Sequence, residues 1–267
     1  MLHLLKIELK KMTNYRTFWV VCGLYFITIG FSTASGMEFL KWLASFIDGF
    51  GEELNIDRIP LYHFPDVWLN LVWWSGLFKV LLGIMVVISI TNEYSYRTLR
   101  QNIIDGLSRW QFLASKILLN GLLSLTSVLL IFLIAGITGF IYTPDIQWKY
   151  VFTDLEFYLA YFLEIFEYLS FALLLGVLIR RSGLTIILLL LSGMLELIIK
   201  LNIDDYFPNS VPFFPLESIS QLVPLPVYRY AFMEIQDYVK LSSVAIAVSW
   251  TFVFNYLSYL RLKKADI

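Results

Sequence analysis

The chain has 267 residues, of which 58% are hydrophobic, 17% aromatic and only 15% charged, with a mean hydropathy of +0.71. A soluble domain usually contains about 25% charged and about 45–50% apolar residues, so this composition excludes an ordinary soluble fold. Intrinsic disorder is excluded for the same reason, and the single cysteine excludes a disulfide scaffold. A formal net charge of −1 gives no reason to expect nucleic acid as a partner. The composition predicts an all-α polytopic membrane protein.

Six apolar stretches are long enough to cross a membrane as helices. A spanning helix needs about 20 mainly apolar residues, and runs that are continuous and not alternating exclude barrel strands. The predicted spans are residues 18–34, 67–90, 117–142, 155–179, 184–199 and 241–260. They predict a single transmembrane domain over residues 1–267. Small residues at 32–36 also fit a signal-peptide cleavage site, but the long patterned segment before the first span favours a retained helix.

The basic residues near the span ends predict the orientation. With the N-terminus in the cytoplasm, 13 of the 20 basic residues lie on the cytoplasmic side, as the positive-inside rule requires. These are Lys6, Lys10, Lys11, Arg16, Arg97, Arg100, Arg109, Lys116, Arg180, Arg181, Arg261, Lys263 and Lys264. We therefore predict that both termini are cytoplasmic.

Residues 1–16 precede the first span and have the pattern of an amphipathic helix. The apolar positions recur at helical spacing, and basic residues occupy the other side. The apolar residues are Leu2, Leu5, Leu9 and Met12, and the basic ones are Lys6, Lys10 and Lys11. This pattern predicts an interfacial helix whose basic face meets anionic lipid. An ordinary positively charged flank of the first span is the alternative.

Residues 200–240 separate the last two spans and contain five of the eight prolines. The segment is too broken to span the membrane and too apolar to lie fully in water. Non-helical backbone at membrane depth is tolerated where protein or a watery cavity satisfies it. We predict broken re-entrant helices on the outer side, with a plain exposed loop as the alternative.

Residues 92–111 connect the second and third spans and predict a short cytoplasmic helix. Leu99, Ile103 and Ile104 share one face of this helix. The sequence Asp105-Gly106 ends it, because glycine readily adopts the left-handed conformation that follows a helix. Ser108 and Gln111 then form a capping-box pattern that begins the next helix. A short helix so placed is suited to transmit force from a cytoplasmic partner to both spans.

Four charged residues are predicted to lie inside the membrane: Lys79, Glu164, Glu167 and Glu196. A charge at mid-bilayer costs about 2.5–3.5 kcal/mol on insertion scales, so such residues pair with one another or face water. Glu164 and Glu167 are three residues apart on one helix, and both can face one partner. One interpretation is a structural ion pair of Lys79 with Glu164 or Glu167. The other is a polar patch on a substrate or ion path.

The sequence lacks the motifs of the common catalytic sites. It contains no GxxxxGK[ST], HExxH, CxxC or GxSxG pattern. His3 and His63 lie outside the predicted spans and cannot join Cys22, inside the first span, in a metal cluster. We therefore expect no catalytic residues, no bound metal and no cofactor on this chain. The energy for transport would come from a partner or an ion gradient.

Residues 92–116 resemble the cytoplasmic signature of ABC-2 type permeases, the membrane subunits of type V ABC exporters. In that family a Glu ends the second span, a Thr and basic residues follow, and a Gly-x-Ser-Arg turn leads to a Lys that opens the third span. The corresponding residues are Glu93, Thr98, Arg100, Gly106, Ser108, Arg109 and Lys116. The basic C-terminus at 261–267 is also similar to that of the family. One departure is Arg97, where many members have Gly.

The resemblance implies a permease subunit of an ATP-driven exporter that is not an enzyme by itself. It implies pairing with a second copy or a similar permease in the bacterial cytoplasmic (inner) membrane. Two copies of a separately encoded ATPase would bind ATP and Mg²⁺. The resemblance also implies that residues 92–111 couple to that ATPase through Glu93, Tyr96, Arg97, Thr98, Arg100, Gly106 and Arg109. Substrates in the family include peptides and antibiotics, lipids and lipid-linked glycans, and ions.

Two other functions remain open from the residues alone. An ion-coupled secondary transporter would use Lys79, Glu164, Glu167 and Glu196, and it predicts inverted repeats, of which the spans show no convincing sign. A non-transporting membrane scaffold would explain the spans but not a capped helix between two of them.

Overall fold

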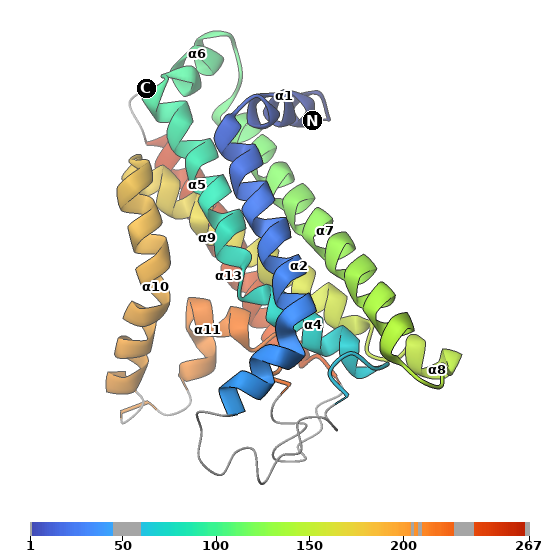
Figure 1. Cartoon of the computed structure of the whole chain (residues 1–267). Coiled ribbons are helices and arrows are strands. Elements are labelled where there is room, and N and C mark those ends of the chain that lie inside the picture. The colour runs from blue at the N-terminus through green and yellow to red at the C-terminus, as the bar shows by residue number, and fades with distance from the viewer. Residues whose placement is uncertain (1, 45–59, 204–205, 208–209, 227–237, 265–267) are drawn as a thin grey trace.

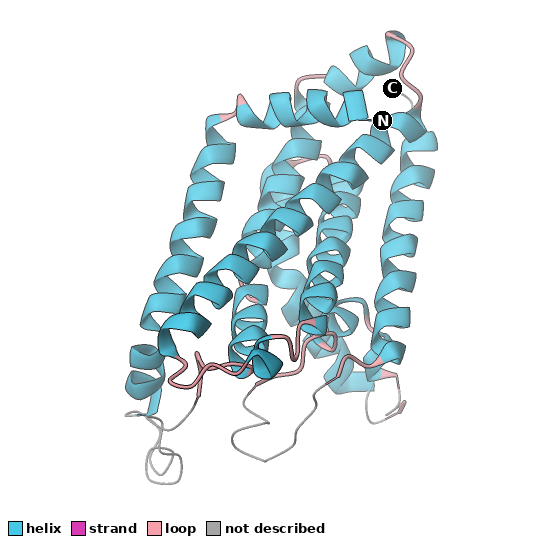
Figure 2. Ribbon diagram, turned by 90° about the vertical axis from the view of Figure 1, so that its right-hand side faces the viewer, coloured by secondary structure: helices cyan, strands magenta, loops and turns pink. Residues whose placement is uncertain are grey.

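The computed structural model describes residues 2–44, 60–203, 206–207, 210–226 and 238–264, and within these ranges every regular element is a helix. The long helices lie side by side in one bundle (Figures 1 and 2). The elements are α1 (Leu2–Thr13), α2 (Arg16–Ala44), α4 (Asp66–Gly76), α5 (Lys79–Ser95), α6 (Thr98–Ile104), α7 (Arg109–Tyr142), α8 (Trp148–Val151), α9 (Glu156–Ile179), α10 (Ser182–Ile203), η2 (Val211–Phe213, a 3₁₀ turn), α11 (Pro215–Ser220) and α13 (Leu241–Lys263).

Five of the described helices are long and apolar enough to cross a membrane, and a sixth span results if α4 and α5 count as one. Each predicted span lies on these helices, apart from Leu155 before α9 and the break in the second span, but α2 continues to Ala44 and α7 already begins at Arg109. The all-helical fold of a multi-pass membrane protein is therefore confirmed, whereas the side of the membrane on which each end lies stays a prediction.

The second span is broken, which the sequence analysis did not predict. Helices α4 and α5 meet at an angle of 42° across Leu77 and Phe78. Sharp bends in helices occur at proline or at Gly/Ser pairs, and Ser75-Gly76 stands immediately before this one. Lys79, predicted to lie deep inside an unbroken helix, is instead the first residue of α5.

Helix α9 is the centre of the bundle. It packs against α4, α5, α7, α10, α11 and α13. In the apolar stretch that contains α9 (Trp148–Ile179), 61% of the residues of the most apolar segment are buried in the bundle, against 17% for α10. The outer helices present large apolar side chains outwards, such as Phe31 of α2, Leu133 of α7 and Met194 of α10. These surfaces are suited to contact lipid acyl chains.

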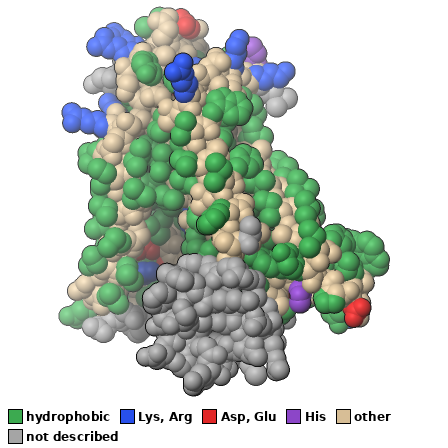
Figure 3. All heavy atoms as spheres, viewed as in Figure 1, with side chains coloured by type: hydrophobic (Ala, Val, Ile, Leu, Met, Phe, Trp, Pro, Cys, Tyr) green, Lys and Arg blue, Asp and Glu red, His purple; other side chains and the backbone are tan. Residues whose placement is uncertain are grey.

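Helix α1 lies across the end of the bundle that also carries α6 and the two ends of the chain (Figure 1). Leu5, Leu9 and Met12 pack towards the core, as the amphipathic pattern predicted. The predicted basic face is wrong in one respect, because Lys11 points towards buried carboxylates and not away from the protein. On the face shown in Figure 3, Lys and Arg side chains gather at this end of the molecule, and hydrophobic side chains cover the length below it.

The segment between α10 and α13 contains η2 and α11, which confirms the predicted short broken helices in its described part. Helix α11 packs against α9 and α13 inside the bundle. Residues 227–237 of this segment, and residues 265–267 of the basic C-terminus, lie outside the described residues.

Candidate functional site

The ends of helix α6 are defined by three local features. Arg97 precedes the helix with a left-handed φ of 58°, a conformation that glycine adopts more readily than residues with a side chain. After the helix, Gly106 has a φ of 96°. The N–H of Gly106 donates to the carbonyl of Ile103, and that of Leu107 donates to Asn102, which is the Schellman arrangement. The predicted glycine stop is therefore confirmed.

The capping box that begins α7 is also confirmed. Ser108 Oγ accepts a hydrogen bond from the backbone N–H of Gln111 at 3.1 Å, and Gln111 Oε1 accepts one from the N–H of Ser108 at 2.9 Å. Of the three apolar residues predicted to share one face of α6, Leu99 is buried and Ile103 is half-buried. Ile104 is 68% exposed, so that part of the prediction is wrong.

Behind α6 lies a cluster of four charged residues, the buried Glu8, Glu93 and Lys116 and the partly exposed Lys11, which we call the ion-pair cluster. Lys116 Nζ lies 2.5 Å from Glu8 Oε2 and 3.1 Å from Glu93 Oε1. Lys11 Nζ lies 3.0 Å from Glu93 Oε1 and 3.4 Å from Glu8 Oε1. Glu8, Glu93 and Lys116 are all at least 96% buried. The cluster joins α1, α5 and α7.

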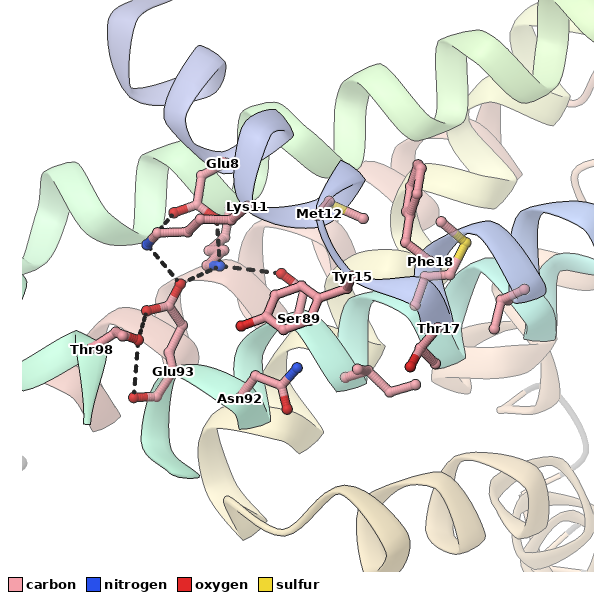
Figure 4. Close-up of a pocket in the computed structure, with 14 residues that line it drawn as sticks. Glu8, Lys11, Met12, Tyr15, Thr17, Phe18, Ser89, Asn92, Glu93 and Thr98 are labelled. Carbon is pink, nitrogen blue, oxygen red and sulfur yellow. Dashed lines mark hydrogen bonds and ion pairs between the residues drawn. The ribbon is translucent and has the colours of Figure 1, made fainter. Parts of the chain in front are cut away.

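Helix α6 is attached to this cluster through Thr98. Its hydroxyl donates a short hydrogen bond to Glu93 Oε2, the carboxylate oxygen that the two lysines leave free. Figure 4 shows Lys11 between Glu8 and Glu93, and Thr98 beside Glu93. Burial lowers the pKa of Lys11, but the Glu8 and Glu93 carboxylates raise it by more, so the pKa lies above its ordinary value and the ammonium stays charged.

A cavity of about 110 Å³ adjoins the ion-pair cluster and is lined mainly by apolar side chains of α1, α2 and α5. The two lysines and two carboxylates neutralise one another, so the cluster offers no excess charge to a ligand in this cavity. Its chemistry is that of a rigid connection: buried, mutually satisfied charges hold the helices in one arrangement.

The structure divides the predicted coupling residues into two groups. Glu93 and Thr98 belong to the buried connection, so Glu93 cannot meet a partner directly in this conformation. The second group is exposed and consists of Tyr96, Arg97, Arg100 and, in the turn after α6, Gly106. Half-buried Arg109 instead donates from Nη1 to the carbonyl of Lys263, at the end of α13, at 2.5 Å.

The roles of Glu8 and Lys11 are not predicted by the sequence pattern of α1. The available signal was the presence of one acidic residue in an otherwise basic amphipathic helix, three residues before a lysine. That spacing places both side chains on one face. The depth at which they are buried could not be read from the sequence, because α5 and α7 supply their partners.

A second candidate site consists of the predicted intramembrane charges. Lys79 Nζ lies 2.7 Å from Glu164 Oε1, so the predicted ion pair is present. Gly76 makes room for it at the break between α4 and α5, since a Cβ at this position would lie 2.7 Å from Glu164 Oε1. A cavity of about 290 Å³ adjoins Lys79 and is lined also by Tyr168, Leu216 and Ile219.

Glu167 and Glu196 do not pair with Lys79 but hold helix α11. Glu196 accepts hydrogen bonds from the backbone N–H groups of Leu216 at 2.8 Å and Glu217 at 2.7 Å. Ser218 Oγ lies 2.9 Å from Glu167 Oε1. The expectation that Glu164 and Glu167 face one partner is therefore wrong, because α5 supplies the partner of one and α11 that of the other.

Comparison with known proteins gives a family without a described activity. No curated protein matches the chain. A family model described as "Protein of unknown function (DUF2705)" matches residues 21–267, which is most of the chain. The match includes the first apolar span from residue 21 onwards, the other five spans, α6 and both candidate sites apart from Glu8 and Lys11 of α1. The chain therefore belongs to the DUF2705 family of proteins of unknown function.

Proposed function

We propose that this protein is the membrane-spanning permease subunit of an ATP-driven exporter, coupled to separate ATPase subunits through residues 92–111. The observation that supports it best is α6. It is a short helix with defined ends, it lies between two apolar spans, and it is attached to a buried ion-pair cluster. A loop that only connected two spans would need neither the glycine stop after α6 and the capping box before α7 nor the buried attachment.

The outer surface of α6 is suited to a protein contact. Only Leu99 of this seven-residue helix is buried. Tyr96 and Ile104 are 64% and 68% exposed, and Arg100 is exposed between them. An exposed aromatic, an exposed aliphatic and an arginine on one short segment are the residue types that anchor protein interfaces. In this proposal they insert into a groove of the ATPase.

The ion-pair cluster would transmit movement of α6 to three other helices. A displacement of Thr98 acts on Glu93 of α5, and through the two lysines on α1 and α7. Because buried ion pairs lose much of their energy when one partner moves away, these helices are expected to move with α6 as a unit. The basic residues at this end of the molecule support a cytoplasmic location, where ATP is available.

Co-purification tests this proposal. The chain is isolated from its native membrane in mild detergent, and associated subunits are identified by mass spectrometry. We expect a near-stoichiometric ATPase with a GxxxxGK[ST] motif. The Arg100→Glu variant should lose it, since the reversed charge lies on α6. Arg181→Glu, an equally exposed reversal in the turn between α9 and α10, should retain it. Recovery of an isolated wild-type chain, under conditions in which known complexes survive, would contradict the proposal.

An ion-coupled transporter is the second candidate, favoured by the buried charges around the break between α4 and α5. It requires no ATPase partner. If the wild-type chain purifies alone and drives ion-dependent uptake in proteoliposomes, this function replaces the first.

A further inference from the structure

Glu167 differs from Glu8, Glu93 and Glu164, which each have a lysine partner, and from Glu196, which accepts two backbone hydrogen bonds. The side chain of Glu167 is fully buried, and none of the ion pairs among the described residues involves it. Its Oε2 has no hydrogen-bond partner within the described part of the chain. The charged form of a carboxyl group in such surroundings is far more costly than the neutral form.

The contact of Glu167 with Ser218 shows where a proton fits. Ser218 Oγ lies 2.9 Å from Glu167 Oε1 and also 2.8 Å from the carbonyl oxygen of Pro215. A serine hydroxyl has one proton to donate, and a carbonyl can only accept. If Ser218 donates to Pro215, the contact with Glu167 becomes a hydrogen bond only when Glu167 itself is the donor. A proton on Oε1 satisfies both short contacts.

The charged groups near Glu167 already have partners of their own, so they would not neutralise a negative charge on Glu167. Glu164 is paired with Lys79, Glu196 with two backbone N–H groups, and Lys200 with Glu217 at 2.5 Å. The charged groups that act on it are Glu164 on its own helix, Lys79 on α5 and Glu196 on α10, and Glu196 in turn has Lys200 of α10 and Glu217 of α11 beside it. Each of the two cations among them already has a carboxylate.

From this geometry we propose that Glu167 is a proton-binding site, protonated at neutral pH, and that release of its proton is linked to movement of α11. Ionised Glu167 would be repelled by Glu164 and Glu196, and it would take the Ser218 hydroxyl away from Pro215. Since Leu216 and Ile219 of α11 line the cavity beside Lys79, movement of this helix opens the cavity towards Glu167. The site is independent of the ATPase coupling and would exist in either kind of transporter.

Thermal unfolding of the purified chain from about pH 6 to about pH 10 tests the proposal. Glutamine mimics the neutral carboxyl group but cannot lose a proton. At about pH 6 the Tm of Glu167→Gln should be no lower than that of the wild type, because the unfolded wild-type chain has already released the proton that folded Glu167 keeps. As the pH rises, the wild type should lose more stability than the variant, because the unfolded wild-type chain releases a proton that folded Glu167 keeps. Wild-type and variant curves that stay parallel over the whole range would overturn the proposal.

Glu164→Gln, one helical turn away, is the matched control. It removes the counter-ion of Lys79 and should already lower the Tm at about pH 6, by more than about 3 °C. An equal loss in Glu167→Gln at that pH would show an ionised Glu167 and overturn the proposal. The titration is repeated with choline in place of Na⁺. If the wild type is more stable at high pH in Na⁺ than in choline, Glu167 binds a metal cation and not a proton, and the proposal is overturned.

Infrared spectroscopy keeps the proposal testable if the variant does not fold. The wild-type protein at neutral pH should show the carbonyl band of a protonated carboxyl group in a water-free environment, and the band should disappear on titration to about pH 10. A spectrum without this band at neutral pH would overturn the proposal.

Discussion

At the residue scale, Lys116 is the centre of the ion-pair cluster. Its ammonium contacts both Glu8 and Glu93, and it also donates to Ser89 Oγ at 3.2 Å. Its side chain is only 3% exposed, so solvent cannot replace these partners. The lysine therefore compensates two carboxylates that come from different helices, and Lys11 alone would have to hold both if it were removed.

Replacing Lys116 with methionine should destabilise the protein by about 3–5 kcal/mol, because the change leaves two buried carboxylates with a single lysine between them. Denaturant unfolding in detergent measures the effect. Lys10→Met, which removes an exposed lysine of α1, is the control and should change the free energy of unfolding by no more than about 0.5 kcal/mol. Equal stability of the two variants would show that the ion-pair cluster contributes nothing.

At the scale of single elements, the residue before α6 and the interior of α6 place opposite demands on the backbone. Arg97 adopts the left-handed conformation, which is unfavourable for a residue with a side chain, whereas Arg100 lies inside the helix. The same substitution should therefore have opposite effects at two exposed arginines only three residues apart.

Arg97→Gly should stabilise α6 by about 0.5–1 kcal/mol, because glycine relieves the left-handed strain. Arg100→Gly should destabilise it by about 1 kcal/mol, the usual cost of glycine inside a helix. Hydrogen exchange of the α6 amides reports both changes, as slower exchange in the first variant and faster exchange in the second. Faster exchange in Arg97→Gly would contradict the observed conformation.

Features fixed by neighbouring residues could be predicted from the sequence. The spans follow from apolar length, the stop at Gly106 from glycine's conformational freedom, and the capping box from the spacing of Ser108 and Gln111. Features that depend on packing could not. The break in the second span contains no proline, the residue that most clearly predicts a bend. Lys79 pairs with Glu164 and not with Glu167 because α5 and α11 pack against different parts of α9.

At the scale of the whole molecule, the distribution of charge predicts the orientation in the membrane. The basic turn between α9 and α10 and the chain ends lie at one end, and the turn between α7 and α8 lies at the other (Figure 1). The positive-inside rule places the first end in the cytoplasm.

Cysteine labelling tests this orientation. In a Cys22→Ser background, a membrane-impermeant maleimide should label Asp145→Cys, between α7 and α8, in intact cells. It should label Arg181→Cys, between α9 and α10, only after the membrane is permeabilised. Both native residues are exposed, so access to the reagent depends on the side of the membrane and not on burial. The reverse pattern would place α6 outside the cell and exclude coupling to an ATPase.

Site-specific photo-crosslinking in the native membrane tests the central claim most directly. A photoreactive amino acid is placed at Ile104 of α6 or, as a control, at Trp148 at the opposite end of the bundle; the native side chains are 68% and 66% exposed. We predict that position 104 captures an ATPase subunit, identified by its phosphate-binding loop, and that position 148 does not. Capture of that subunit from neither position, or equally from both, would contradict coupling through α6.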